Sequence, residues 1–158
     1  MTAPVQEPTQ GRQDSGQDWR TRQLFRRPAP PLASANYEIK LFADTSSAVV
    51  GDGAFFFPIP RDVSNLYLTD AQAGVSTPGG SGTMTVQVHN VDAAVDMLST
   101  EITIDAGDTT SFTAAVPSVV DVANSQVSVG QTIRIDVDTI PASDGLGLAV
   151  MLRFSPTP

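Results

Sequence analysis

The sequence predicts an all-β protein, a two-sheet antiparallel β-sandwich of the jelly-roll type, preceded by an extended N-terminal arm. Apolar and polar residues alternate along several short runs, which is the period of a strand with one buried face. Turn-forming residues, including 12 Gly and 12 Pro, separate these runs, and no stretch has a convincing helical period. With 158 residues, the chain suits one domain plus an additional segment. We divide it into an arm, residues 1–35, and a sandwich domain, residues 36–158.

The two clearest strands lie at residues 83–90 and 98–104. Each places three apolar side chains on one face, and this inward set is Met84, Val86, Val88, Leu98, Ile102 and Ile104. Residues 91–97 between them are too few to hold the helix that a parallel crossover requires. We therefore expect the two strands to pair antiparallel or to face each other across the sandwich.

Three strands are expected before this pair. They lie at residues 37–42, 54–59 and 65–75, with turn-rich connections at 44–53 and 76–82. Pro58 marks an edge strand or a strand end, because proline cannot donate to the ladder. The three phenylalanines of 54–59 are expected to pack in the core, which is favoured over the alternative of a ligand-binding platform.

After the central pair, the pattern is weaker and then becomes clear again. A tight turn is expected at 105–108, an extended segment at 111–115, a short strand or a single helical turn at 119–124, and strands at 131–140 and 145–154. In 131–140, alternation points Arg134, Asp136 and Asp138 outward. In 145–154, it gathers Leu148, Val150, Leu152 and Phe154 on one face.

Charge is distributed unevenly along the chain. Residues 1–35 contain five arginines and three acids, a net charge of +2, whereas residues 36–158 contain four basic and fourteen acidic residues, a net charge of −10. The acidic body would repel nucleic acid and anionic membranes, so we expect neither as a partner. No run approaches the roughly 20 apolar residues of a spanning helix, and the N-terminus lacks the apolar region of a signal peptide.

The arm changes character at Trp19. Residues 1–18 hold almost nothing to bury and are expected to be disordered on their own. Aromatic and arginine side chains, which are enriched at interface anchors, then follow. The candidate partner-binding residues are Trp19, Arg20, Arg22, Leu24, Phe25, Arg26 and Arg27. We expect this segment to dock on a neighbouring subunit; the alternative is a leader whose aromatics fold back on their own domain. Nucleic-acid binding is a weaker interpretation, since three acids interrupt five arginines.

No catalytic site is expected. The chain has no cysteine and one histidine, which excludes a zinc site built on several His or Cys ligands. His89 falls on the outward face of its strand without a motif-bearing serine nearby, so a solvated histidine is favoured over a triad member. Asp136 and Asp138 share a face, as the carboxylates of a glycosidase would, but two outward acids on one strand are usually a solvated surface.

Loop aspartates raise the question of calcium. Carboxylates in loops can converge on this ion, and the candidates are Asp44, Asp52, Asp105, Asp108 and Asp144. No EF-hand spacing is present, and aspartates also form turns. Turn formation is the favoured interpretation, and we expect no cofactor.

From about residue 37 to 154, the chain resembles a family of small proteins and C-terminal domains encoded by tailed bacteriophages. The phrases that carry the resemblance are IKLFADTSSAVVGDGAFFFPIP, GTMTVQVHNV, DMLSTEITIDAGDTTS and TIRIDVDTIPASDGLGLAVMLRF, in that order. They span roughly three quarters of the chain, and DMLST-x-ITIDAG-x-T is the most specific part. The resemblance implies a β-sandwich displayed on the virion as a head decoration or a tail or baseplate component, and it implies no catalytic residues. The arm lies outside it.

These observations lead to one functional expectation and two alternatives. We expect a capsid decoration, or cement, subunit of the virion, a homo-oligomer with a trimer favoured, whose partners are the major capsid protein or other virion subunits. The first alternative is a tail or baseplate protein that contacts the host surface. The second is a carbohydrate-binding module, since jelly rolls often carry sugar sites.

Overall fold

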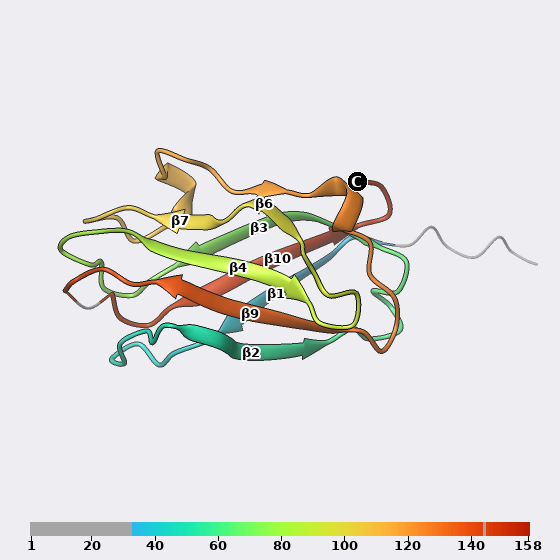
Figure 1. Ribbon diagram of the computed structural model, residues 1–158, viewed down its shortest axis with the longest axis horizontal. Coiled ribbons are helices and arrows are strands. Elements are labelled where there is room, and N and C mark those ends of the chain that lie inside the picture. Colours follow the sequence, from blue (N-terminus) through green and yellow to red (C-terminus); the bar gives the residue numbers. More distant parts are fainter. Residues whose placement is uncertain (1–32, 144) are drawn as a thin grey trace, which may run out of the picture. The chain divides into compact units, whose positions relative to one another are not determined.

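The computed structural model describes residues 33–143 and 145–158, and its regular structure there consists of strands and short 3-10 turns (Figure 1). The strands are β1 (Ala35–Lys40), β2 (Gly51–Pro58), β3 (Tyr67–Gly74), β4 (Met84–Asn90), β5 (Val95–Asp96), β6 (Leu98–Thr100), β7 (Ile102–Ile104), β8 (Val119–Val120), β9 (Thr132–Thr139) and β10 (Ala149–Ser155). The turns are η2 (Ser111–Thr113) and η3 (Val122–Asn124). The all-β prediction is confirmed.

Antiparallel sheets form the two layers of a β-sandwich. One sheet has the order β1-β10-β3, and the other has the order β2-β9-β4 with β5 and β7 both paired to β4. A small ladder joins β6 to β8. Met84 of β4 lies opposite Ile104 of β7 in an antiparallel pair, so the first of the two expected arrangements is found for residues 102–104.

The core lies between the sheets and follows the predicted alternation. β4, β9 and β10 each bury every second side chain. The fully or nearly fully buried set on these strands includes Met84, Val86, Val88, Ile133, Ile135, Val137, Val150, Leu152 and Phe154. Burying one such side chain contributes about 1.5–3 kcal/mol, so these inward faces dominate the stability of the body.

Two sequence-based assignments differ from the structure. The run 98–104 is not one strand, because the chain leaves the strand conformation at Glu101 and divides into β6 and β7. β6 then pairs with β8 while β7 pairs with β4, which alternation within a single strand could not predict. Segment 111–115, expected to be extended, begins with η2 because Thr110 caps a 3-10 turn by accepting a hydrogen bond from the Phe112 N–H. For segment 119–124, a short strand or a single helical turn was expected, and the structure has both, the strand β8 followed by the 3-10 turn η3.

The core prediction for the three phenylalanines is wrong in part. Phe57 is half-buried, but Phe55 is 37% exposed and Phe56 is 54% exposed. β2 is the edge strand of its sheet, as Pro58 at its end indicated, so one flank has no neighbouring strand. Alternation also turns Phe56 to the outer face, where it lies opposite Arg134 of β9.

The two sides of the sandwich are built differently (Figure 1). On the side that we call the open side, β1 and β2 are both edge strands, and Tyr37 meets Phe57 with ring centroids 4.8 Å apart. On the covered side, residues 105–127 run along β3. Main-chain hydrogen bonds from Val75 N–H to Thr109 O (2.9 Å) and from Leu68 N–H to Ser125 O (2.8 Å) attach this segment.

Candidate binding surfaces

The predicted partner-binding residues of the arm lie outside the described residues. They are Trp19, Arg20, Arg22, Leu24, Phe25, Arg26 and Arg27. The described body offers two surfaces of its own, one at the open side and one on the outer face of the three-stranded sheet.

The first surface, the β2 rim, consists of Val49, Val50, Phe55 and Phe56. Their exposed fractions are 63%, 51%, 37% and 54%, and all four lie within one short segment that leads into and along the edge strand. A hollow of about 260 Å³ adjoins Val49 and Val50 at the start of β2. Exposed apolar side chains beside unpaired backbone groups are typical of a surface that contacts another chain.

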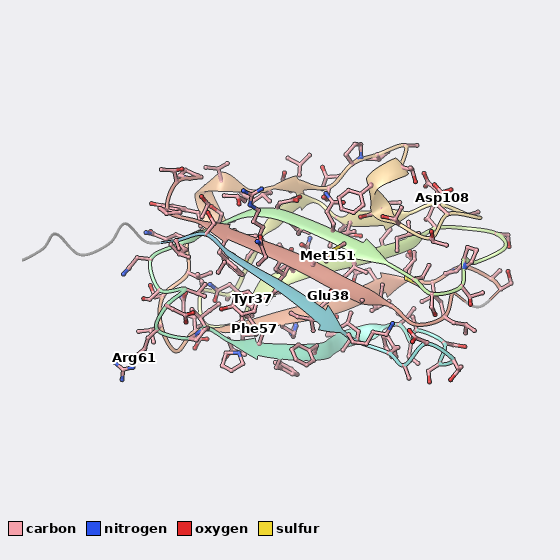
Figure 2. The ribbon with its side chains drawn as sticks, turned by 180° about the vertical axis from the view of Figure 1, so that it is seen from behind. Tyr37, Glu38, Phe57, Arg61, Asp108 and Met151 are labelled. Carbon is pink, nitrogen blue, oxygen red and sulfur yellow. The ribbon has the colours of Figure 1, made fainter. Side chains whose placement is uncertain are left out.

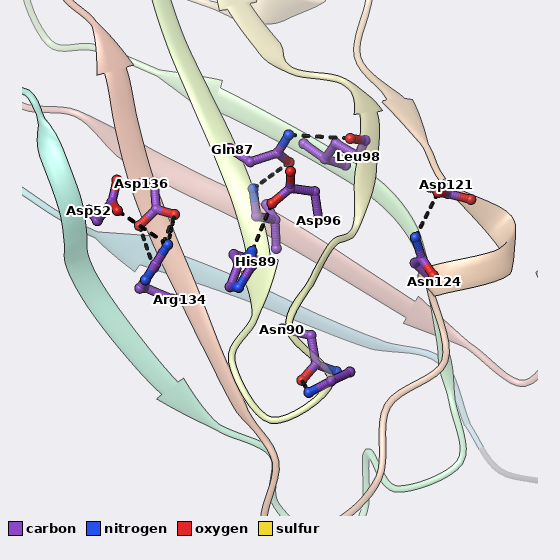
Figure 3. A network of polar contacts seen from close by, with 12 residues as sticks. Asp52, Gln87, His89, Asn90, Asp96, Leu98, Asp121, Asn124, Arg134 and Asp136 are labelled. Carbon is purple, nitrogen blue, oxygen red and sulfur yellow. Dashed lines mark hydrogen bonds and ion pairs between the residues drawn. The ribbon is translucent and has the colours of Figure 1, made fainter.

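An ion pair between a buried carboxylate, Asp136, and the partly exposed Arg134 holds the β2 rim in place (Figure 3). Asp136 was expected to be solvated, but it is only 4% exposed, which corrects that prediction. Its Oδ1 lies 2.8 Å from Arg134 Nε and accepts a 2.7 Å hydrogen bond from the Gly53 N–H. The hydrogen bond to Asp136 raises the pKa of Arg134 above its ordinary value. Asp136 therefore ties central strand β9 to the irregular start of β2.

Glycine at position 53 is required by the same arrangement. Its φ of +79° is in the left-handed region, and a Cβ there would lie 2.9 Å from the Phe56 ring. The ring thus packs directly over the Gly53 backbone and beside its cross-strand neighbour Arg134. The exposed Phe56 is held by its surroundings, which suits a contact surface.

The second surface is a groove of about 490 Å³ on the outer face of β1, β10 and β3, which we call the sheet groove. Two rungs of cross-strand neighbours line it: Asn36, Arg153 and Asp70 on one, and Glu38, Met151 and Gln72 on the next. Phe112, 67% exposed, contributes from η2. Figure 2 views this face and shows Glu38 and Met151 on adjacent strands.

Hydrogen bonds organise one half of the sheet groove. Ser111, 4% exposed, donates from Oγ to Gln72 Oε1 over 2.6 Å and accepts from the Ala73 N–H over 2.9 Å. Gln72 Nε2 in turn donates to Asp70 Oδ1 over 3.0 Å. The amide of Gln72 and the carboxylate of Asp70 are therefore oriented before any ligand arrives.

The loop aspartates serve turns and strands where the structure describes them. Asp105 Oδ2 accepts from the Ala115 N–H (2.8 Å), and Asp108 Oδ2 accepts from Thr113 Oγ1 (2.8 Å), so both fix the segment around η2. Two other loop aspartates lie beside basic side chains: Asp44 pairs with Lys40, and Asp52 lies 3.5 Å from Arg134. Asp144 is outside the described residues. Within residues 33–143 and 145–158, no three His, Cys, Asp or Glu side chains gather as a metal site would require.

His89 belongs to a structural pair. Its Nδ1 lies 2.7 Å from Asp96 Oδ1 across the β4–β5 hairpin, and no described serine hydroxyl hydrogen-bonds to it. Asp138 is exposed overall, but partial desolvation of its carboxylate is the largest cause that raises its pKa, and repulsion from Glu101 and Asp136 raises it further. Because Asp136 is engaged by Arg134 and Gly53, these two aspartates do not form a free carboxylate pair of the kind a glycosidase uses.

Sequence reasoning missed both surfaces, although each left a signal. The proline at the end of β2 indicated an edge strand, and an edge strand leaves phenylalanines exposed. The sheet groove depends on which strands become neighbours, and its six floor residues come from three segments far apart in the sequence. Outward polar positions in β1, β3 and β10 were a necessary condition for it and were visible in the alternation.

Comparison with known proteins found no match among family models, curated proteins or solved structures. No helix within the described part of the chain is both long and apolar enough to cross a bilayer.

Proposed function

We propose that this chain is a non-enzymatic bacteriophage virion structural protein, a capsid decoration or cement subunit that attaches to the particle partly through residues 1–35. One observation carries the proposal: a leader of net charge +2 precedes a body of net charge −10. Opposite charges on separate segments favour contact between one subunit's leader and another subunit's body. The resemblance of residues 37–154 to tailed-phage proteins supports this assembly, and the proposed location is the virion.

The β2 rim adds a second means of attachment. Phe55 and Phe56 offer apolar area on a strand edge, and the Arg134–Asp136 pair keeps that edge in place. Aromatic side chains are common anchors at protein interfaces. In this proposal, the rim contacts the major capsid protein or another copy of this chain.

The jelly-roll assignment belongs to the same proposal. The strand orders β1-β10-β3 and β2-β9-β4, with β5 and β7 paired to β4, support it, because β1 to β4 alternate between the two sheets and the chain returns from β9 to the other sheet at β10. The hydrogen bond from Ser118 Oγ to Ala71 O (2.7 Å) brings the segment that leads to β8 against the free edge of β3.

A homo-oligomer, with a trimer favoured, fits the attachment role. Closed symmetry presents several leaders and several rims at once, so weak contacts add up to stable binding without a single strong site. Mass photometry of the full chain measures this directly, and a trimer is the expected species. No contact with nucleic acid or membrane is part of this proposal.

Removal of residues 1–31 tests the attachment. We expect the truncated protein to bind particles lacking it at an occupancy at least about 10-fold below the full chain, since it loses every arginine and aromatic side chain of the leader. The matched control removes residues 2–15, which keeps Trp19 to Arg27, and should bind as the full chain does. Unchanged occupancy after removal of 1–31 would overturn the proposal.

A position on the tail or baseplate is the second candidate. The sheet groove favours it, because a hollow with oriented polar side chains could meet a ligand on the host surface. Micrographs of particles carrying labelled protein separate the two positions, since density on the head supports decoration and density on the tail supports the second candidate.

A further inference from the structure

The sheet groove has the chemistry of a site for neutral sugars. A sugar ring carries hydroxyl groups around its edge and C–H groups on its faces, so its binding site needs mixed hydrogen-bond donors and acceptors together with an apolar platform. Among the lining residues, Asp70 and Glu38 supply acceptors, and Arg153 supplies donors. Phe112 supplies an exposed ring.

The groove also has the right size and extent. Its volume of about 490 Å³ is within the range of ligand sites. A second hollow of about 220 Å³ shares Glu38 and Met151 with it and continues to Gly74 and Ala149, the next rung along the sheet. Rungs on one face of a sheet are about 7 Å apart, so the three rungs provide room for more than one ring.

The site is organised in advance, which distinguishes it from an ordinary polar surface. The buried Ser111 orients Gln72, and Gln72 holds Asp70. The same turn, η2, carries both Ser111 and Phe112, so the hydrogen-bonding side and the ring are fixed to each other. Rigid polar groups lose little conformational freedom on binding.

Charge selects among glycans. Across the two hollows the carboxylates are Glu38 and Asp70 and the cations are Arg153 and Lys40, but Lys40 is already paired with Asp44. The lining therefore has no excess of positive charge, and the body around it has a net charge of −10. Phosphorylated, sulfated and uronic-acid chains are therefore disfavoured. We propose that the sheet groove binds a neutral oligosaccharide, with its sugar face against Phe112 and its hydroxyls on Asp70, Gln72 and Arg153.

Calorimetry with defined sugars tests this site in the full chain. The probes are neutral oligosaccharides of glucose, mannose, galactose and N-acetylglucosamine, with oligogalacturonate as the anionic comparison. We expect at least one neutral probe to bind with a Kd below about 1 mM, oligogalacturonate to bind more weakly, and Phe112→Ala to weaken the neutral probe about 10-fold. Gln72→Ala should weaken it as well.

Val129→Ala is the matched control, since it also truncates an exposed apolar side chain, 53% exposed, but lies outside the groove. Thermal melting shows that each variant is folded. The proposal is overturned if no neutral probe binds, if binding survives Phe112→Ala unchanged, or if the groove takes a peptide in place of sugar. Phe112→Ala should still occupy particles normally, so failure here is distinguishable from failure of the virion proposal.

Discussion

On the open side of the sandwich, two edge strands meet through the rings of Tyr37 and Phe57, whereas on the covered side, residues 105–127 run along β3 and attach to its backbone. Both arrangements close the same core, but they leave different surfaces. On the covered side, backbone groups of β3 form hydrogen bonds with residues 105–127, and the sheet groove lies beside this segment. The open side keeps a strand edge with exposed phenylalanines, a surface suited to another protein chain.

The open side depends on a single charged anchor, and its removal should have the largest effect. Asp136→Ala leaves the Arg134 guanidinium and the Gly53 N–H without their buried acceptor. We expect the free energy of unfolding to fall by about 2–3 kcal/mol in urea denaturation, because the Gly53 N–H loses its buried acceptor and Arg134 keeps only the more distant Asp52. Asp52→Asn is the control, since Asp52 lies 3.5 Å from Arg134 and is 72% exposed, and it should change stability by less than about 1 kcal/mol. Equal effects of the two substitutions would show that Asp136 is not the anchor.

The covered side has a neutral anchor, so the corresponding change should be smaller. Ser111→Ala removes the acceptor of the Ala73 N–H and the donor to Gln72. We expect a loss of about 1–2 kcal/mol, together with faster hydrogen exchange at the Ala73 amide. Ser99→Ala, at an exposed position of the same side, should stay within about 0.5 kcal/mol. If Ser111→Ala costs as much as Asp136→Ala, the contrast between the two sides does not hold.

Asp138 lies in β9 beyond Asp136, and its substitution should have the smallest effect. Burial raises its folded pKa above the ordinary value of 3.8, and neighbouring carboxylates add to this, so the ionised form destabilises the fold. Asp138→Asn should therefore raise stability at pH 7, by less than about 1 kcal/mol because solvent screens an exposed group. The penalty disappears as pH falls below the unfolded pKa, so the advantage of the variant should vanish in acid. Denaturation at pH 7 and pH 3 measures this, and a variant less stable than the parent at pH 7 contradicts it.

Alternation predicted the inward faces well. The predicted inward residues are buried, among them Val86, Val88, Ile133, Ile135 and Phe154. In a regular strand in the middle of a sheet, each side chain points to one of the two faces, so alternation in the sequence predicts which face it joins. The prediction failed where a strand changes partner or lies at an edge. Nothing local in the sequence marks Glu101 as the point where pairing passes from β8 to β4. In β2, Pro58 indicated an edge strand, but the phenylalanines themselves do not show which of them the missing neighbour leaves exposed.

The candidate surfaces were harder to predict than the fold. Alternation predicts that Asp136 points away from the core. It does so, but it is buried because the Gly53 backbone and the Arg134 side chain cover it. Likewise, Ser111 and Gln72 are 39 positions apart, and only the attachment of residues 105–127 to β3 brings them together. Such contacts depend on long-range register, which a pattern of period two does not contain.

Ala35 at the start of β1 lies opposite Phe154 near the end of β10, so the body's first strand begins beside the point where its last strand ends. A foreign peptide joined after this rung would emerge next to residue 35. The body thus has the geometry that circular permutation and peptide display require, with its ends adjacent and its central strands undisturbed.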